Sequence, residues 1–430
     1  MNTPATPAPS DTTATAAVPR LRPASLAELR DVVRDTARTA PRLLVAGAGT
    51  AAGWGGAPEP PDAVLDTTAL GGVQAHNPAD MTVAVRAGTL LSELREELSE
   101  HGQRVAFDPA RADATVGGLL ATADGGPLQQ AYGTLRDLVI GVTVVLADGT
   151  VAGSGGHVIK NVAGYDLAKL FHGSLGTLGV VAEVVLRLHP LPACVRTVAV
   201  AATPSEASEL GGRLMAKGLE PAALDWVDGL LLVRLEGTAD GTRTRADAVR
   251  GLAPRGADAR LLDGDTAAGH GARTDLIARG GHGDTVLRFG ALPTAAARIA
   301  EALPKAADGV TVETAGAVGV GVHTVRLSGG GAEGHAALAH RLREAVERAD
   351  GTCTVLRRDG LPGSFPAWGR PPAAVGVLRA VKNSFDPGGR FGAGRLAGWL
   401  PAPPAAAGTG GTEADADTAA GKGATRAEES

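Results

Sequence analysis

Short apolar runs, helical stretches and turns alternate through the first part of the chain. Leu26, Leu29 and Val33 recur at helical spacing behind a capping box that runs from Ser25 to Glu28. A second amphipathic helix is predicted over Thr89–His101. Strands are predicted at Leu43–Ala46, Val64–Asp66, Met81–Ala87, Leu138–Ala147, Thr150–Ala152 and Leu178–Leu188. This mixture indicates an α+β fold rather than a repeating βαβ array.

The pattern changes after His189–Ala193, which we take as a domain boundary. Between Ala193 and Ala373, apolar strands alternate with helices rich in Ala and Arg, such as Ala295–Leu303 and His335–Ala349. The predicted strands are Arg196–Ala201, Leu230–Leu235, Val286–Phe289, Thr324–Leu327 and Thr352–Leu356. We expect an antiparallel sheet that helices cover on one face.

Composition narrows the class of protein. Residues 1–19 and 401–430 are rich in Pro, Ala, Thr and Gly, and we predict that both are disordered tails. The net charge of −5 argues against a surface for nucleic acids or anionic membranes. Two cysteines, Cys194 and Cys353, are too few for an iron–sulfur cluster or a disulfide scaffold. With neither a signal peptide nor an apolar membrane span in the sequence, we expect a cytoplasmic location, with membrane association only through partners.

The 61 glycines point to backbone that lies close to a ligand. Gly47, Gly49 and Ala52 match the loose dinucleotide pattern G-x-G-x-x-A, but a Rossmann fingerprint must open a helix. Here Pro58, Pro60 and further glycines follow, so the loop after the first buried strand cannot be helical. A non-helical nest of backbone N–H groups still suits an anionic ligand, although an ordinary turn is the alternative.

Four further strings carry a resemblance to a known family. They are Thr115-Val116-Gly117-Gly118, Tyr132-Gly133 with Arg136-Asp137, Lys160-Asn161 with Ala163-Gly164-Tyr165-Asp166, and Gly173-Ser174 with Gly176-Thr177-Leu178-Gly179. With these strings, residues 22–192 resemble the FAD-binding domain of the vanillyl-alcohol oxidase/p-cresol methylhydroxylase (PCMH) superfamily, and within it the E subunits of bacterial glycolate oxidases. Leu378–Leu396 resembles the closing helix and loop of that family, but Gly392-Ala393 replaces its usual Asn-Pro.

The resemblance implies a PCMH-type, two-subdomain FAD-binding domain over residues 20–192. A smaller α/β domain with an antiparallel sheet and the closing helix would follow over residues 193–400. The first glycine loop would hold the FAD pyrophosphate, and Val180 would bind the adenine or ribose end through its backbone. The residues expected to bind FAD are Ala46, Gly47, Ala48, Gly49, Thr50, Pro109, Thr115, Gly117, Gly118, Thr122, Tyr132, Gly133, Asp137, Lys160, Asn161, Tyr165 and Val180. Because the first loop has no His or Cys, we expect non-covalent FAD.

Several of these residues have alternative roles. Lys160 or Lys169 near the flavin would stabilise its reduced anion, but a surface charge or an ion pair with Asp166 is the alternative. Tyr165 could equally pack in the core, and Asp137 could form a turn. Asp225, Trp226 and Asp228 fit core and turn positions better than a surface site.

No metal site is expected. The hydroxy-acid dehydrogenases of the superfamily carry a His-Gly-Asp-Gly-Asn-x-His motif, whereas His282-Gly283-Asp284 continues here without a second histidine. His335 and His340 are five apart and point to different sides of a helix. The chain therefore lacks the family's usual groups for oxidising a 2-hydroxy acid, and its catalytic residues are unknown from the sequence.

The resemblance favours an oxidoreductase that relays electrons as one flavoprotein subunit of a glycolate oxidase-like complex. A sister flavoprotein would oxidise the small 2-hydroxy acid, and an iron–sulfur subunit would receive the electrons. Two alternatives are a stand-alone FAD-dependent dehydrogenase of a small hydroxy acid or alcohol, and a non-catalytic FAD-binding assembly subunit.

Overall fold

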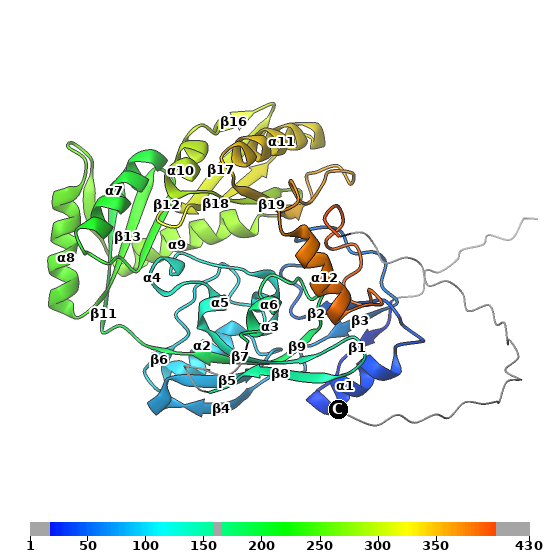
Figure 1. Ribbon diagram of the computed structural model, residues 1–430. Coiled ribbons are helices and arrows are strands. Elements are labelled where there is room, and N and C mark those ends of the chain that lie inside the picture. Colours follow the sequence, from blue (N-terminus) through cyan, green and yellow to red (C-terminus); the bar gives the residue numbers. More distant parts are fainter. Residues whose placement is uncertain (1–17, 158–164, 401–430) are drawn as a thin grey trace, which may run out of the picture.

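The computed structural model describes residues 18–157 and 165–400 in two packed parts (Figure 1). One part holds three small sheets and the first six α-helices, and the other is built on one large sheet. The predicted tails lie almost entirely outside the described residues, as do Lys160 and Asn161. No helix in the two described ranges has the length and apolar character needed to cross a membrane.

The chain begins in a three-stranded parallel sheet with the order β1-β3-β2. Its strands are β1 (Arg20–Leu21), β2 (Leu43–Ala46) and β3 (Ala63–Asp66), and helix α1 (Leu26–Asp35) packs beside it. The Ser25 hydroxyl accepts a hydrogen bond from the Glu28 N–H at 3.2 Å and caps α1, as the sequence predicts.

The largest sheet of this part is a five-stranded antiparallel sheet with the order β4-β5-β9-β7-β8. Its strands are β4 (Val73–Asn77), β5 (Thr82–Arg86), β7 (Val139–Val145), β8 (Val151–Gly155) and β9 (Val180–Arg187), and β6 (Gln103–Arg104) pairs with β10 (His189–Pro190) nearby. The predicted hairpin at Asp148-Gly149 joins β7 to β8, with Gly149 at a φ of 87°. The remaining elements are η1 (Pro78–Asp80), α2 (Leu91–Ser99), α3 (Val116–Thr122), α4 (Gln129–Tyr132), α5 (Leu135–Leu138) and α6 (Ala168–Phe171).

The second part contains a nine-stranded antiparallel sheet. Its strands are β11 (Cys194–Ala201), β12 (Ala223–Val227), β13 (Leu230–Gly237), β14 (Ala259–Leu262), β15 (Thr285–Gly290), β16 (Ala306–Ala307), β17 (Val310–Ala317), β18 (Val322–Ser328) and β19 (Thr352–Arg358). All five strands predicted from the sequence are present, whereas the sequence patterns did not reveal β12, β14, β16 and β17.

Helices cover both faces of the large sheet, so the expectation of helices on one face is wrong. Helices α7 (Pro204–Ala216), α8 (Ala239–Leu252), α10 (Pro293–Glu301) and α11 (Ala332–Arg348) pack on one face. Helix α9 (Gly264–Arg279) packs on the opposite face, where Ile277 contacts Ala199 and Ala315. This face lies toward the first part of the molecule (Figure 1). Helix α9 is rich in Gly and Ala and has a weak apolar stripe, which explains why the sequence did not reveal it.

The chain then returns to the first part through α12 (Val375–Phe385) (Figure 1). Beyond α12, the Arg390 carbonyl accepts a hydrogen bond from the Leu43 N–H at 2.7 Å, and the Gly392 N–H donates to the Leu43 carbonyl at 3.1 Å. The Arg390 guanidinium also donates to the Val33 and Ala147 carbonyls at 2.9 and 2.6 Å. The replacement of Asn-Pro by Gly392-Ala393 therefore leaves this closing loop attached to β2.

Buried His323 makes the fold sensitive to acid. The ring stacks on Phe289 at 5.3 Å, and neither ring nitrogen has a hydrogen-bond partner among the described residues. Burial lowers the pKa of His323 to about 4. Between pH 6.5 and 4 the unfolded chain therefore binds more protons, and this histidine makes stability fall as the pH falls, by about 1.4 kcal/mol per pH unit.

We expect His323→Leu to weaken this acid sensitivity, because leucine has no group to protonate. Denaturant unfolding at several pH values between 7.5 and 4.5 measures the effect. The same change at exposed His101 is the control. Parallel pH profiles for the wild type and His323→Leu would contradict the assignment.

Candidate cofactor site

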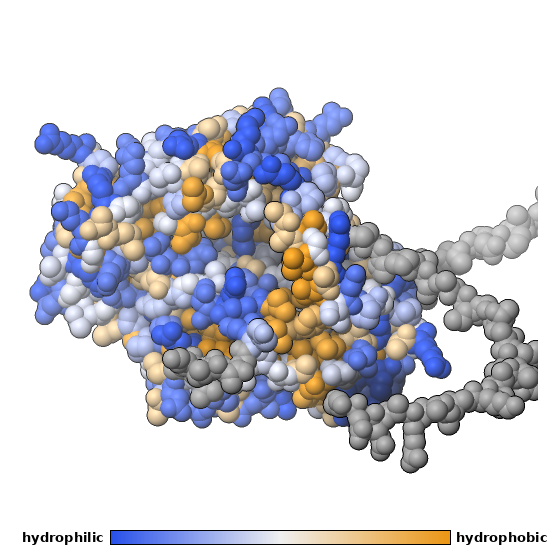
Figure 2. All heavy atoms as spheres, in the orientation of Figure 1, coloured by the Kyte–Doolittle hydropathy of each residue, from blue (hydrophilic) through white to orange (hydrophobic). Residues whose placement is uncertain are grey.

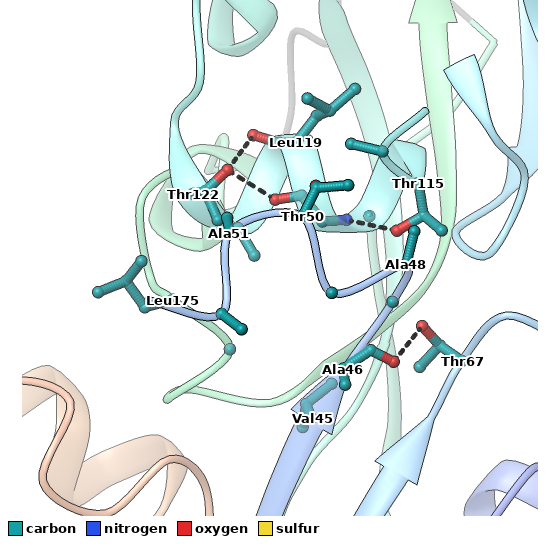
Figure 3. A pocket seen from close by; sticks show the side chains of 18 of the residues that line it. Val45, Ala46, Ala48, Thr50, Ala51, Thr67, Thr115, Leu119, Thr122 and Leu175 are labelled. Atoms are coloured by element: carbon teal, nitrogen blue, oxygen red, sulfur yellow. Dashed lines mark hydrogen bonds between the residues drawn. The ribbon is translucent and has the colours of Figure 1, made fainter. Parts of the chain in front are cut away.

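The loop Gly47–Gly56 follows β2 and forms one wall of a pocket. It contains turns and bends but no helix, as the sequence predicts. Gly49 has a φ of 77°, which favours glycine because it has no Cβ. The chain therefore leaves the buried strand β2 as a sharply folded ribbon whose backbone faces the pocket (Figure 3).

Helix α3 forms the opposite wall (Figure 3). The Thr115 hydroxyl caps α3 by accepting from the Gly118 N–H at 3.2 Å. A Cβ added to Gly47 would lie 2.2 Å from that hydroxyl, and one added to Gly117 would lie 2.7 Å from the Ala87 Cβ. Glycine is therefore required at both positions by close packing, which brings the loop and the helix together around a narrow space.

The pocket has the polar groups that an anionic ligand needs. The backbone N–H groups of Ala48, Gly49, Thr50 and Ala51 donate to no acceptor among the described residues. Arg395 also lines the pocket, and its Nε has no hydrogen-bond partner there although the residue is only 7 % exposed. A buried guanidinium N–H and a row of unpaired amides are costly unless a ligand accepts from them. These groups fit the pyrophosphate of a dinucleotide.

The closing loop after α12 brings Arg395 to this place. Arg395 Nη1 donates to the Ala52 and Trp54 carbonyls at 2.8 Å each, and the Gly56 N–H donates to the Arg395 carbonyl at 3.0 Å. A Cβ at Gly56 would lie 2.6 Å from the Gly394 carbonyl oxygen. The two loops therefore touch backbone to backbone, and the pocket is built from both ends of the chain.

A buried charge cluster lies at the end of the pocket near the large sheet. Asp124, 1 % exposed, accepts from Arg288 at 2.7 Å and from Arg111 at 3.3 Å. Both guanidinium groups also lie over the Trp54 ring, at 4.8 and 5.0 Å from its centroid. Arg111 Nη2 donates to the Ala278 carbonyl at 2.9 Å and so connects this cluster to α9.

The structure brings most of the predicted cofactor residues together. Those that line the pocket are Ala46, Gly47, Ala48, Gly49, Thr50, Thr115, Gly117, Gly118 and Thr122. Val180 begins β9 and is buried, while its neighbours Gly179 and Val181 line the pocket. The cofactor role of these residues stays a prediction, but they share one site.

Other predicted residues do not line the pocket. The Tyr132 hydroxyl donates to Glu236 at 2.8 Å and accepts from Arg104, so this side chain connects the two parts of the molecule. Asp137 accepts from the Thr134 N–H and so caps α5, the turn-type role that its sequence context also allowed.

Three further predicted residues are also outside the pocket, and two cannot be placed. Gly133 has a φ of 77° beside Asp137, Pro109 is buried just before Ala110, and Tyr165 is 88 % exposed. Lys160 and Asn161 lie outside the described residues, so their expected contacts remain predictions. Lys169 forms an ion pair with Asp166 at 2.7 Å, which was the alternative to a flavin contact.

The histidine candidates have structural partners or lie apart. In the His282-Gly283-Asp284 string, the Asp284 carboxylate accepts from Arg326 at 2.6 Å. The His335 ring contacts the Thr285 hydroxyl at 2.9 Å and the Gly329 carbonyl at 2.6 Å. Within residues 18–157 and 165–400, no three His, Cys, Asp or Glu side chains are grouped so as to hold a metal ion.

Sequence reasoning missed Arg111, Asp124 and Arg395. No spacing distinguishes these residues from the other arginines and aspartates of the chain, because each reaches the pocket through contacts between distant segments. A usable signal existed only for Arg395, which directly follows the glycines of the closing loop. Leu175 and Gly176 also line the pocket and lie within the glycine-rich segment Gly173–Gly179, but they were not among the predicted cofactor residues.

Comparison with known proteins agrees with this geometry. Residues 19–154 match the family model described as FAD binding domain. The chain is 32 % identical over 175 residues to the glycolate oxidase subunit GlcE of Escherichia coli, a match that covers 40 % of this chain and 50 % of that subunit. It is 37 % identical over 165 residues to a mitochondrial D-lactate dehydrogenase [cytochrome] of Arabidopsis thaliana, covering 38 % and 29 % of the two chains.

These matches span half or less of each of these two relatives. Among solved structures, alkyldihydroxyacetonephosphate synthase aligns with a TM-score of 0.63 at 16 % identity, over 87 % of this chain and 76 % of that one. This likeness shows that the fold extends beyond the matched domain.

The family match and the relatives identify the first part of the chain as a PCMH-type FAD-binding domain, and FAD is its cofactor.

We expect Gly47→Ala to weaken FAD binding by roughly tenfold or more, which corresponds to about 1.4 kcal/mol. The added methyl group would displace the Thr115 hydroxyl and with it the end of α3. Flavin absorbance per protein chain, measured during titration of the apoprotein, gives the affinity. Gly71→Ala is the control, because its Cβ would meet nothing within 4 Å. Equal affinities for the two variants would contradict this role of Gly47.

Arg395→Gln should lower FAD affinity by roughly 10- to 100-fold, the effect of losing one hydrogen bond to a charged group. Arg395→Lys keeps the charge and should recover part of the loss. Exposed Arg370 is a suitable control position for the same Gln change. Unchanged affinity in a folded Arg395→Gln protein would exclude a contact between Arg395 and the cofactor.

Proposed function

We propose that the chain is an FAD-dependent oxidoreductase that relays electrons as a flavoprotein subunit of a glycolate oxidase-like complex. The observation that carries the FAD-dependent part is the pocket of unpaired backbone N–H groups closed by Arg395. The similarity to a glycolate oxidase subunit supports the complex. In this proposal a sister flavoprotein oxidises the small 2-hydroxy acid, and an iron–sulfur subunit accepts the electrons.

The residues of the pocket support non-covalent binding of FAD. No His or Cys is among the described residues that line it, so the side chains that usually form covalent flavin links are missing there. When bound, FAD supplies the redox chemistry. The chain would hold the cofactor through amides and Arg395, while Arg111 and Arg288 add positive charge at one end of the site.

The cysteine content and the surface support the proposed partners. Two cysteines cannot bind an iron–sulfur cluster, so electrons that leave the flavin need an acceptor outside this chain. Apolar side chains gather at the surface over α12 (Figure 2), where Val377 is 64 % and Leu378 41 % exposed. Leu167, which precedes α6, and Leu170 within α6 are 44 % and 37 % exposed. Phe171 of α6 packs on Phe385 of α12. We call these four exposed residues the α6–α12 patch.

The position of the α6–α12 patch suits a docking surface for the electron acceptor. Lys382 of α12 donates to the Thr177 carbonyl at 2.6 Å, and the adjoining residues Leu175 and Gly176 line the cofactor pocket. A partner on this patch would therefore lie next to the cofactor site. Exposed apolar groups of this kind are typical of protein–protein contacts.

Co-purification of the tagged chain from its own cells tests the complex. We expect flavin together with iron in the eluate, and loss of the iron but not of the flavin from Val377→Ser/Leu378→Ser. Leu292→Ser, which changes a 75 % exposed leucine elsewhere, should keep both. Reduction of the isolated, FAD-loaded chain by glycolate would contradict the relay role. An eluate without iron from the unmodified chain would contradict the complex.

A further inference from the structure

A second cavity lies between the two parts of the molecule, beside the cofactor pocket. Its volume is about 180 Å³. Strands β12, β17 and β18 of the large sheet, helix α9 and the loop Ala123–Pro127 after α3 line it. It is thus bounded by a rigid sheet, and the loop that closes it is continuous with the helix of the cofactor pocket.

The ion pair between Arg288 and Asp124 lies where the cavity and the cofactor pocket adjoin. Asp124 lines the pocket, whereas its neighbours Ala123 and Gly125 line the cavity. Arg288 lines the cavity and donates to Asp124 at 2.7 Å. A small molecule in the cavity would therefore share the wall around this ion pair with the cofactor site.

Asp225 is the side chain best placed to bind such a molecule. The residue is 6 % exposed and lines the cavity from β12. Its Oδ2 accepts from the Thr274 hydroxyl at 2.8 Å, and its Oδ1 has no partner among the described residues. Burial raises the pKa of Asp225 to about 7. This buried group is thus able to accept or donate a hydrogen bond near neutral pH.

The charge of the lining disfavours an acidic ligand. Asp108 and Asp275 also line the cavity, and burial raises the pKa of both, to about 6 for Asp108. Arg288 is the only basic residue among the described lining residues, and Asp124 already accepts from it. Arg95 and Arg279 lower the pKa of Asp275 from nearby, but neither lines the cavity. A carboxylate in the cavity would therefore meet three acidic groups and one basic group that already donates to Asp124.

We propose that this cavity binds a small, uncharged molecule with a hydroxyl group, which Asp225 holds beside the cofactor site, and that it rejects the 2-hydroxy-acid anion. The inference rests on the FAD-dependent function proposed above. It also offers a physical reason for assigning the oxidation of the acid to a sister subunit.

Two molecules of nearly equal size test the proposal. Propane-1,2-diol carries a hydroxymethyl group where D-lactate carries a carboxylate. Ligand-observed NMR of the FAD-loaded chain, with both at equal concentration at pH 7.5, reports which one binds. Flavin absorbance in the same sample shows whether FAD is present. We expect saturable diol signals that exceed those of lactate by at least fivefold.

Variants of the acidic lining residues test whether they select the diol over lactate. Asp225→Leu should abolish the diol signal while the flavin spectrum stays unchanged, and Asp240→Leu on the surface of α8 is the control. The double substitution Asp225→Asn/Asp275→Asn removes two negative charges while keeping the side chains nearly the same size. It should increase lactate binding. Preference for lactate, equal binding of both, binding of neither, or a diol signal that survives Asp225→Leu would overturn the inference. Failure to take up FAD would instead contradict the proposed function.

Discussion

The close contact between two loops from opposite ends of the chain is the constraint on which the site depends. The closing loop pairs with β2 through Leu43, and its glycine backbone lies directly on the first glycine loop. This contact holds in place the loop with the unpaired amides of Ala48–Ala51 and brings Arg395 into the same pocket. Because a Cβ at Gly47 or Gly56 would overlap neighbouring atoms, the composition of these loops follows from their packing.

Charge is distributed unevenly around the space between the two parts. Arg395 lines the cofactor pocket, and Arg111 and Arg288 lie at its end with Asp124 as their buried counter-charge. Beyond Asp124 the lining becomes acidic at Asp225 and its neighbours. The same wall thus divides a site suited to an anionic dinucleotide from one suited to a neutral molecule. A relay subunit that does not itself accept the hydroxy acid is consistent with this division.

The features that the sequence predicted best are those that depend on local backbone geometry. Ser25 caps α1, Gly149 turns the hairpin, and the Gly47 loop is not helical, because each of these features is determined by neighbouring residues. The resemblance to known flavoproteins added the α3 residues that face this loop. Strands of the large sheet were found because their apolar runs are short and bounded by turns.

Features that depend on long-range contacts could not be predicted from the sequence. Tyr132 lies in a glycine-rich string that resembles a cofactor loop, yet its hydroxyl binds Glu236, a partner 104 positions away in sequence. Asp225 looked like a core or turn residue, because nothing local shows that α9 and the loop after α3 leave a cavity at its side chain. Helix α9 itself has too little apolar periodicity to be recognised.

The visible spectrum of the purified chain tests the central claim most directly, namely that side-chain-poor loops hold FAD without a covalent bond. Reconstitution of the apoprotein with FAD should give a yellow protein with about one flavin per chain. Acid precipitation should then leave the colour in the supernatant. A chain that stays colourless at saturating FAD, or a pellet that keeps the flavin after acid treatment, would contradict the account.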